Sequence, residues 1–218
     1  MIKFERVEVM NWENAIRGAR NPMNSWEKSD SEFDVTTYWD EEQTLVHETN
    51  QTVIGPNDLS LLMRLRNAGP DERKFMRQIF VSVDITAPLY WWKEFDTYKV
   101  GTVANSCSTM HKIHAKEFTL DDFSHEQLEA WSLEILNDVI WGLNIARDVY
   151  VEYKNKPDWW QMIQLLPTSY NQLRTVTLNY EVLANMYAAR KSHKLDEWRD
   201  LCAWIETLPY SQLITGEE

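Results

Sequence analysis

A segment in the middle of the chain combines residue types that could hold a flat, charged ligand. It reads APLYWWKEFDTYKVGTVANSCSTM over residues 87–110. Two adjacent tryptophans are followed by Lys93, Glu94, Asp96 and Lys99, and then by a run of small side chains. Aromatic faces can stack on a planar heterocycle, and cations can bind phosphate. Most of the eleven tryptophans are nevertheless expected in the core or in an oligomer contact.

Histidine, cysteine and glycine give weaker signals. His111 and His114 are three residues apart, as metal ligands on a helix can be, but no third ligand accompanies them, so no metal site is predicted. Cys107 could be a nucleophile, but nothing near it in the sequence marks an activated thiolate, so an inert thiol is favoured. Among six glycines there is no G-x-G-x-x-G or Walker motif, which argues against a Rossmann or P-loop site.

Basic residues offer a second possible ligand site. Arg174, Arg190 and Arg199 fall in the C-terminal part of the chain, and Lys99 falls in the segment at 87–110. Guanidinium groups bind phosphate oxygens bidentately, so these residues could form a phosphate-binding patch. From charge alone, solvated helix faces paired with acidic residues are the favoured interpretation.

Composition limits the class of protein. The 218 residues, 44% hydrophobic and 26% charged, are enough for one domain over residues 1–218. The net charge of −12 argues against nucleic acid or an anionic membrane as the main partner. Two cysteines without metal-ligand spacing favour a reducing, cytoplasmic location. We expect no membrane segment, because the longest apolar runs fall short of about 18 residues.

The first half of the chain is predicted to form strands and short helices. Residues 2–10 alternate like a half-buried strand, and residues 12–20 like a helix. An acidic loop, with at most one short strand, is expected at about 24–51. A helix capped by Asn57 should cover 57–66. The inward residues of the first strand are expected to be Ile2, Phe4, Val7 and Val9.

The strongest strand prediction covers residues 77–86, where β-branched residues alternate on one face. Pro88 can then start a helix. The second half is predicted as helices at 124–152, 159–167, 171–191 and 195–208, the first beginning at a Ser124 cap. Together these elements predict an α+β (mixed α/β) fold with a small central sheet flanked by long helices. The inward residues are expected to be Ile79, Val81, Val83 and Ile85 in the strand, and Trp131, Ile135, Val139, Ile140, Leu143, Ala146 and Tyr150 in the first helix.

The segment 87–102 resembles the signature of the flavin-dependent thymidylate synthases, also called thymidylate synthase complementing proteins. In that family a strand enters Ala-Pro, a helix carries Arg-Gln-Trp-x, and an Arg-His-Arg-x-x-Ser loop follows. Glu94 falls on the glutamine, Lys99 on the last arginine of the loop and Thr102 on its serine. The family's next block, Val-Asn-Glu-x-Ser-x-Arg-Tyr, covers 103–110 and places Cys107 on the serine.

The C-terminal part strengthens this resemblance. The family's Leu-Pro block, its Asn-x-x-x-Leu-x-x-Phe-x-x-x-Arg block and its Glu-Ile-Arg block follow in the same order and spacing. The residues that match are Leu166, Pro167, Asn179, Leu183, Asn185, Arg190, Glu197 and Arg199. The resemblance thus covers residues 79–110 and 164–200.

Membership of this family would imply a homotetramer that holds FAD and converts dUMP to dTMP by reductive methylation. The co-substrates would be methylenetetrahydrofolate and NADPH. The family needs no enzyme nucleophile, so no catalytic residue is assigned, and the task of the protein is orientation and electrostatics. The resemblance assigns flavin contacts to Lys99, Thr102, Asn179 and Asn185, and substrate contacts to Glu94, Cys107, Arg190 and Arg199.

Several family side chains are replaced. Arg77 and Gln78 stand where the family has His and Glu, Ile163 stands for an arginine, and Thr97 and Thr109 stand for two more. Each lost phosphate contact weakens binding by about 1.5 to 3 kcal/mol unless another residue replaces it. Two alternatives therefore stay open: a flavin enzyme acting on another pyrimidine nucleotide, and a non-catalytic oligomeric relative. Possible replacements are Arg174, Lys112 and Arg20.

Overall fold

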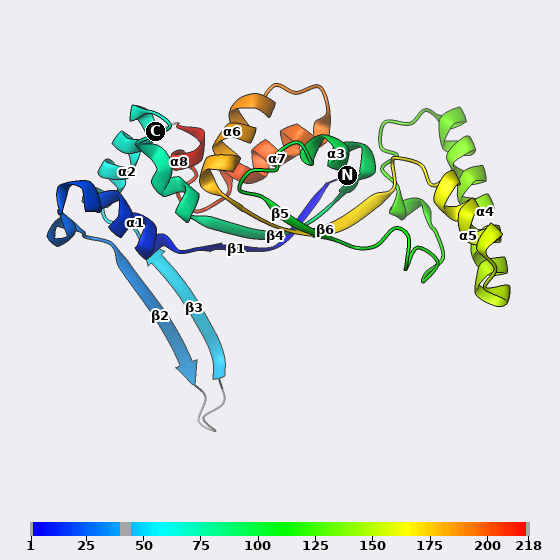
Figure 1. The fold of residues 1–218 in the computed structure, drawn as a ribbon, viewed down its shortest axis with the longest axis horizontal. Helices are drawn as coiled ribbons and strands as arrows, with labels where there is room; N and C mark the ends of the chain where they lie inside the picture. The colour runs from blue at the N-terminus through cyan, green and yellow to red at the C-terminus, as the bar shows by residue number, and fades with distance from the viewer. Residues whose placement is uncertain (1, 40–44, 217–218) are drawn as a thin grey trace. The chain divides into compact units, whose positions relative to one another are not determined.

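The computed structural model describes residues 2–39 and 45–216 and has a mixed α/β fold with a small sheet and many helices, as predicted (Figure 1). One sheet has the strand order β1-β4-β6-β5, and a second consists of β2 and β3. Strand β5 runs antiparallel to β6, with Val103 opposite Thr177. The strands are β1 (Lys3–Met10), β2 (Glu32–Trp39), β3 (Leu45–Val53), β4 (Phe80–Pro88), β5 (Val103–Ser106) and β6 (Asn171–Asn179).

Helices make up most of the remaining described chain. The α-helices are α1 (Trp12–Arg20), α2 (Pro56–Ala68), α3 (Leu89–Phe95), α4 (Ala130–Tyr153), α5 (Lys156–Leu165), α6 (Tyr180–Arg190), α7 (Asp196–Glu206) and α8 (Gln212–Thr215). The 3-10 helices are η1 (Asn21–Met23), η2 (Trp26–Lys28), η3 (Arg73–Gln78) and η4 (Leu120–Asp122). Within residues 2–39 and 45–216, no helix is both long enough and apolar enough to cross a bilayer.

The contacts of the chain divide into two compact units. Unit 1 comprises Met1–Val7, Ser82–Thr177 and His193–Leu201, and unit 2 comprises Glu8–Val81, Leu178–Ser192 and Cys202–Glu218. In unit 1, α4 packs on α5, and in unit 2, α1 packs on α2 and α6 on α8. That residues 1–218 form one domain stays a prediction.

The two N-terminal strand predictions had different outcomes. The inward residues predicted around β4 are each at most 1% exposed, because apolar side chains alternate there without interruption. Ile2, just before β1, is buried, but Val7 within β1 is 42% exposed, so the predicted inward position of Val7 is wrong. The reason is Arg6, whose φ of 51° is left-handed. Such a residue breaks the pleat, so the alternation does not continue across it.

The acidic loop predicted at about 24–51 is wrong. Strands β2 and β3 pair antiparallel over most of it, with Phe33 opposite Thr52 and Thr36 opposite Thr49. Both strands are rich in threonine and valine, which favour extended backbone, and this signal was hidden by the acidic residues among them. Residues 40–44 of the predicted loop lie outside the described residues.

Helix α2 confirms the helix predicted at 57–66, but Asn57 is not its cap. The helix begins at Pro56, and the carboxylate of Asp30 accepts hydrogen bonds from the N–H groups of Asn57 at 2.9 Å and Asp58 at 3.0 Å. The first turn of α2 is therefore capped by a residue distant in sequence, which satisfies two of its free N–H groups.

A fully buried ion pair lies next to this cap. The Asp58 carboxylate accepts hydrogen bonds from Arg20 Nε at 2.6 Å, Ser29 Oγ at 2.7 Å and Ser31 Oγ at 2.6 Å. Burial alone would raise the pKa of Asp58, but the hydrogen bonds from Ser31, Ser29, Arg20 and the Asp30 N–H hold it below its usual range. Arg20, proposed from the sequence as a replacement phosphate ligand, is thus buried in an ion pair with Asp58 in unit 2 and does not serve as one.

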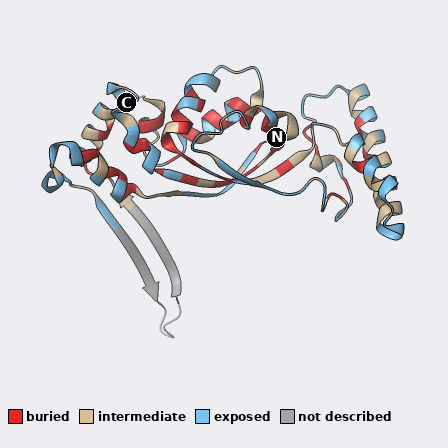
Figure 2. Ribbon diagram, in the orientation of Figure 1, coloured by how far each residue is buried: buried red, intermediate tan, exposed pale blue. Residues whose placement is uncertain are grey.

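Helix α4 begins at Ala130 rather than at the predicted Ser124 cap. The Ser124 hydroxyl instead donates to Asn171 Oδ1 at 2.9 Å. One side of α4 is buried, but Trp131 and Ile135 are 67% and 55% exposed, so their predicted inward positions are wrong. Figure 2 shows many exposed residues along this helix. The buried side comprises Leu136, Ile140, Leu143 and Ala146, and the exposed apolar side comprises Trp131, Ile135, Trp141 and Ile145.

The helix predicted at 171–191 is wrong in its first half, where the chain forms β6. Thr175, Val176 and Thr177 are β-branched and favour the strand. Asn179 then caps α6, which occupies the second half of the prediction. Residues 103–106, which belong to the run of small side chains in the segment 87–110, form β5. The helix predicted at 12–20 is present as α1 with the predicted ends, and those predicted at 159–167 and 195–208 are present as α5 and α7 with shifted ends.

Candidate functional site

The paired tryptophans of the segment 87–110 belong to an aromatic core in unit 1. Trp91 and Trp92, on α3, are fully buried. The ring centroid of Trp91 lies 5.0 Å from that of Phe95 and 4.9 Å from that of Trp198 on α7. These rings therefore fix α7 residues against α3, and they are not free to stack on a ligand.

Two predicted substrate residues lie at the edge of this aromatic core. Glu94 accepts a hydrogen bond from Trp198 Nε1 at 2.7 Å, and its carboxylate lies 3.6 Å from His193 Nε2. Arg199 Nη1 donates to the backbone oxygen of His193 at 2.7 Å, and its guanidinium also pairs with Asp196. The structure thus brings Glu94 and Arg199 together around His193, with both side chains engaged by protein.

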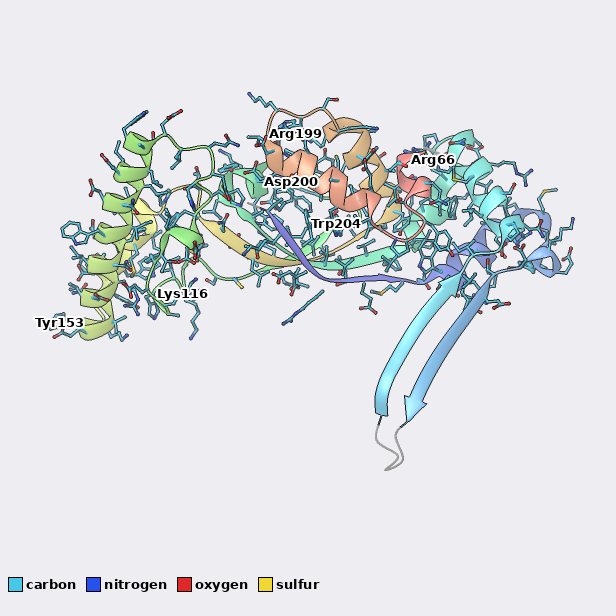
Figure 3. All side chains as sticks on the ribbon, turned by 180° about the vertical axis from the view of Figure 1, so that it is seen from behind. Arg66, Lys116, Tyr153, Arg199, Asp200 and Trp204 are labelled. Atoms are coloured by element: carbon cyan, nitrogen blue, oxygen red, sulfur yellow. The ribbon has the colours of Figure 1, made fainter. Side chains whose placement is uncertain are left out.

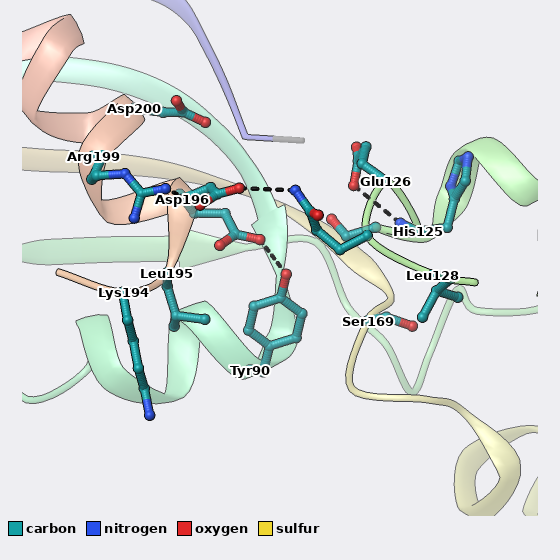
Figure 4. Close-up of a pocket in the computed structure, with 13 residues that line it drawn as sticks. Tyr90, His125, Glu126, Leu128, Ser169, Lys194, Leu195, Asp196, Arg199 and Asp200 are labelled. Carbon is teal, nitrogen blue, oxygen red and sulfur yellow. Dashed lines mark hydrogen bonds and ion pairs between the residues drawn. The ribbon is translucent and has the colours of Figure 1, made fainter. Parts of the chain in front are cut away.

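A pocket of about 810 Å³ opens in unit 1 next to these residues (Figure 4). It is formed by the start of α3, the segment 124–128, Ser169 and the segment 194–200. Of the predicted site residues, Arg199 alone lines it within the described chain. The polar residues that line it are Tyr90, Ser124, His125, Glu126, Gln127, Ser169, Lys194, Asp196, Glu197, Arg199 and Asp200.

The pocket has an acidic lining. The Tyr90 hydroxyl donates to the Glu197 carboxylate, and the pKa of Tyr90 is raised, first by burial and then by Glu197. Burial, followed by the negative charges of Asp196 and Glu197, raises the pKa of Asp200. The residues that line the pocket include four carboxylates, Glu126, Asp196, Glu197 and Asp200, and two cations, Lys194 and Arg199. Such a pocket favours a ligand with N–H or O–H donors and disfavours a phosphate.

The loop assigned to the flavin is separate from the pocket lining. Lys99 is exposed in the turn after α3, and Thr102 is half-buried just before β5. The hydroxyl oxygen of Thr102 is buried without a hydrogen-bond partner among the described residues. Cys107 is exposed directly after β5, where its N–H donates to the Leu173 carbonyl at 2.9 Å. The loop therefore offers an unused hydroxyl and an exposed cation.

The remaining predicted residues lie in unit 2. Asn179 is 7% exposed, and its Oδ1 accepts from the N–H of Val182 at 3.0 Å as the cap of α6. Asn185 is exposed on α6, and its Oδ1 accepts from Arg73 Nη2 at 3.0 Å. Arg190 is half-buried at the end of α6. Asn179 thus acts as the N-cap of α6, a structural role that the sequence did not predict.

Several residues that hold the predicted site residues or line the pocket were not predicted from the sequence. Arg73 and Arg77 both pair with Glu181, and Arg73 also binds Asn185. In the sequence, Arg77 stands out only because it replaces a histidine of the family pattern. Tyr90 and Glu197 meet across 107 positions of sequence, and no local pattern predicts such a contact.

No protein-family model and no curated protein matches the sequence. The structure, however, matches solved structures of the flavin-dependent thymidylate synthase X from Helicobacter pylori, which contain FAD and dUMP. One is 17% identical over 99% of this chain and 97% of that chain, with a TM-score of 0.66. A second is 16% identical over 99% and 98%, also with a TM-score of 0.66. The chain has the thymidylate synthase X fold.

The thymidylate synthase X fold extends the resemblance read from the sequence. That resemblance covered residues 79–110 and 164–200, whereas the match of structure covers nearly the whole chain. The thymidylate synthase X fold thus includes β2 and β3, which carried no family motif. At 17% identity this likeness concerns the fold.

Proposed function

We propose that the protein is a divergent flavin-dependent thymidylate synthase that converts dUMP to dTMP with methylenetetrahydrofolate, FAD and NADPH. The observation that carries this proposal is the match over 99% of the chain to thymidylate synthase X structures that contain FAD and dUMP. The sequence motifs support it independently, because they follow in family order. Fold alone does not fix function, so the residues of this chain must also suit the ligands.

Residues on the flavin loop suit a bound FAD. Thr102 has a buried hydroxyl oxygen without a partner among the described residues, and a ligand hydrogen bond would satisfy it. Lys99 is exposed and can meet a phosphate. In unit 2, Asn185 is exposed and held by Arg73, so its carboxamide has a fixed orientation. When bound, FAD supplies the two-electron reduction that the reaction requires.

Substrate residues are proposed from the family motifs that the sequence resembles. Arg190 would contact the phosphate of the nucleotide, and Cys107, which is exposed, would lie along the substrate. Glu94 and Arg199 would act by positioning, since Glu94 already holds Trp198 and Arg199 already holds His193. We assign no nucleophile, because orientation of the two ligands is sufficient for this reaction class.

We further propose that the protein is a cytoplasmic homotetramer. The exposed apolar side of α4 includes Trp131 and Trp141, which are 67% and 69% exposed. A helix that is apolar on both sides needs a second partner, and another copy of the chain would bury it. Cys107 and Cys202 are both free thiols, and a reducing compartment keeps them so.

Two specific observations favour the alternatives. Asn179 and Glu94, both assigned to ligands, already accept hydrogen bonds from Val182 and Trp198. The pocket in unit 1 has an acidic lining, which does not suit a phosphate. These features favour the non-catalytic relative, whereas a flavin enzyme acting on another pyrimidine nucleotide would have to bind its phosphate outside this pocket.

The test is a titration of the purified protein with FAD, with and without dUMP, followed by visible absorbance. A flavin spectrum that shifts on addition of dUMP, together with NADPH oxidation and dTMP formation, is expected. Lys99→Gln should weaken FAD binding, and the matched control Lys116→Gln should not, because Lys116 pairs with Asp122. Flavin binding with no dTMP would identify the other-nucleotide alternative. A folded oligomer that binds no FAD would refute the enzyme proposal.

A further inference from the structure

A cluster of cations in unit 1 has no role in the proposed reaction. Arg147 and Tyr150 are three residues apart near the C-terminal end of α4 and share one face of the helix, and Lys154 is the left-handed residue that caps this end. Figure 3 shows this end of α4, where Tyr153 is labelled. His114 packs edge-on against Tyr150, with ring centroids 4.9 Å apart. Lys154 Nζ lies 5.4 Å from the centroid of the same ring.

The segment that carries His114 is fixed against α4. The Phe118 N–H donates to Asn144 Oδ1 at 2.8 Å, and Asn144 Nδ2 donates back to the Phe118 carbonyl at 2.9 Å. The Ala115 N–H donates to the Lys112 carbonyl at 2.9 Å, which closes a turn around His114. Lys112 lies two residues before His114 in this turn, and its charge acts on the imidazole together with those of Lys154 and Arg147.

Two polar atoms of this cluster lack partners. Arg147 Nε and His114 Nδ1 are both buried without a hydrogen bond among the described residues. Arg147 does pair with Asp148, through Nη1 at 2.6 Å, but this leaves its Nε–H unused. Burial, followed by the charges of Lys154, Lys112 and Arg147, lowers the pKa of His114. The nearby positive charges lower the pKa because they disfavour the positively charged form of the imidazole.

The end of a helix explains only part of this arrangement. The C-terminus of α4 carries partial negative charge and favours a cation such as Lys154. That effect gives no partner to Arg147 Nε or His114 Nδ1, and each unpaired buried polar atom is costly. An anion with several oxygens would pair both atoms and also neutralise the lysines.

We propose that His114, Lys112, Arg147 and Lys154 form a binding site for the phosphate group of a small molecule. The Nε edge of Arg147 offers the donor geometry that matches phosphate oxygens, and the two lysines add charge. Nucleic acid is a poorer fit, because the chain carries a net charge of −12. The site is independent of FAD and of the proposed reaction.

The test follows the His114 imidazole by NMR in the full-length protein, with the signal assigned by its loss in His114→Gln. Inorganic phosphate is titrated against chloride at matched ionic strength. We expect phosphate to raise the measured pKa of His114 by about one, since an added negative charge favours the imidazolium. Glycerol phosphate is titrated in parallel. Saturation at a lower concentration of inorganic phosphate would identify free phosphate as the ligand, and saturation at a lower concentration of glycerol phosphate would identify a phosphate ester.

Variants separate a built site from general attraction. Arg147→Gln should weaken phosphate binding by about tenfold or more. Lys154→Asn serves as a second variant that should fold, because asparagine tolerates the left-handed φ of 52° at this position. The control is Lys116→Gln, which removes a nearby charge already paired with Asp122. The proposal is overturned if phosphate and chloride give the same His114 titration, or if Lys116→Gln weakens binding as much as Lys154→Asn.

Discussion

Thr102→Val tests whether the flavin loop is built to receive a ligand. Valine has the shape of threonine but lacks the hydroxyl, whose oxygen is buried without a partner among the described residues. An unsatisfied buried polar group costs about 1 to 3 kcal/mol, so its removal should stabilise the ligand-free protein by about 1 kcal/mol. For a chain of this length, that corresponds to a rise of about 2 to 4 °C in the melting temperature.

The affinity for FAD should fall in Thr102→Val, although the stability of the ligand-free protein should rise. If the ligand pairs with this hydroxyl, Thr102→Val loses one hydrogen bond of about 0.5 to 1.5 kcal/mol, which weakens FAD binding about two- to twelvefold. Melting is followed by circular dichroism without FAD, and affinity by quenching of flavin fluorescence. The matched control is Thr175→Val, where the hydroxyl donates to Asp84 Oδ1 at 2.6 Å and the melting temperature should fall. A fall in both variants would mean that Thr102 has a structural partner, and an unchanged FAD affinity would remove it from the flavin site.

Four further outcomes are expected. Asp58→Ala should destabilise unit 2 by about 3 to 5 kcal/mol, because Arg20 is left buried and unpaired, and a denaturation midpoint within error of wild type would contradict this. Because the folded-state pKa of Asp58 is lowered, its contribution is present above the ordinary carboxyl pKa and lost as the pH falls through the folded value; denaturation series at decreasing pH should show this in wild type and not in Asp58→Asn. Tyr90→Phe removes the hydrogen bond to Glu197 and should destabilise the fold by about 1.5 to 3 kcal/mol in thermal melting, and a melting temperature equal to that of wild type would contradict this. Trp141→Gln should reduce the oligomer size in light scattering while the circular dichroism stays unchanged, and an unaltered mass would exclude this side of α4 as a subunit contact.

Local sequence patterns correctly predicted the elements whose hydrophobic spacing fits only one type of secondary structure. The alternation around β4 is uninterrupted, and each of its inward residues is buried. In β6, leucine and valine spacing also fits a helix, and the strand is decided by pairing with β5, which is distant in sequence. The start of β1 was predicted correctly up to Arg6, where a left-handed residue gives no signal in a hydrophobic pattern.

The candidate site was less predictable, because its contacts join distant positions. The resemblance selected Glu94 and Arg199, but their shared contact with His193 depends on how α7 packs on α3. The buried cap formed by Asn179 uses an atom that the family pattern assigns to a ligand. Whether the predicted residues bind FAD and nucleotide stays a prediction.

The closed base of β2 and β3 has a consequence for how the chain can vary. The Gly55 N–H donates to Ser31 Oγ at 3.1 Å, and the Ser31 hydroxyl donates to Asp58, so the chain just before β2 and just after β3 is joined to α2 at one point. Changing the length of a segment whose ends are already held together costs little closure entropy. The paired strands β2 and β3 could therefore be shortened by removing opposite residues from both strands, while the hydrogen bonds of Ser31 and Asp58 keep the rest of unit 2 in register.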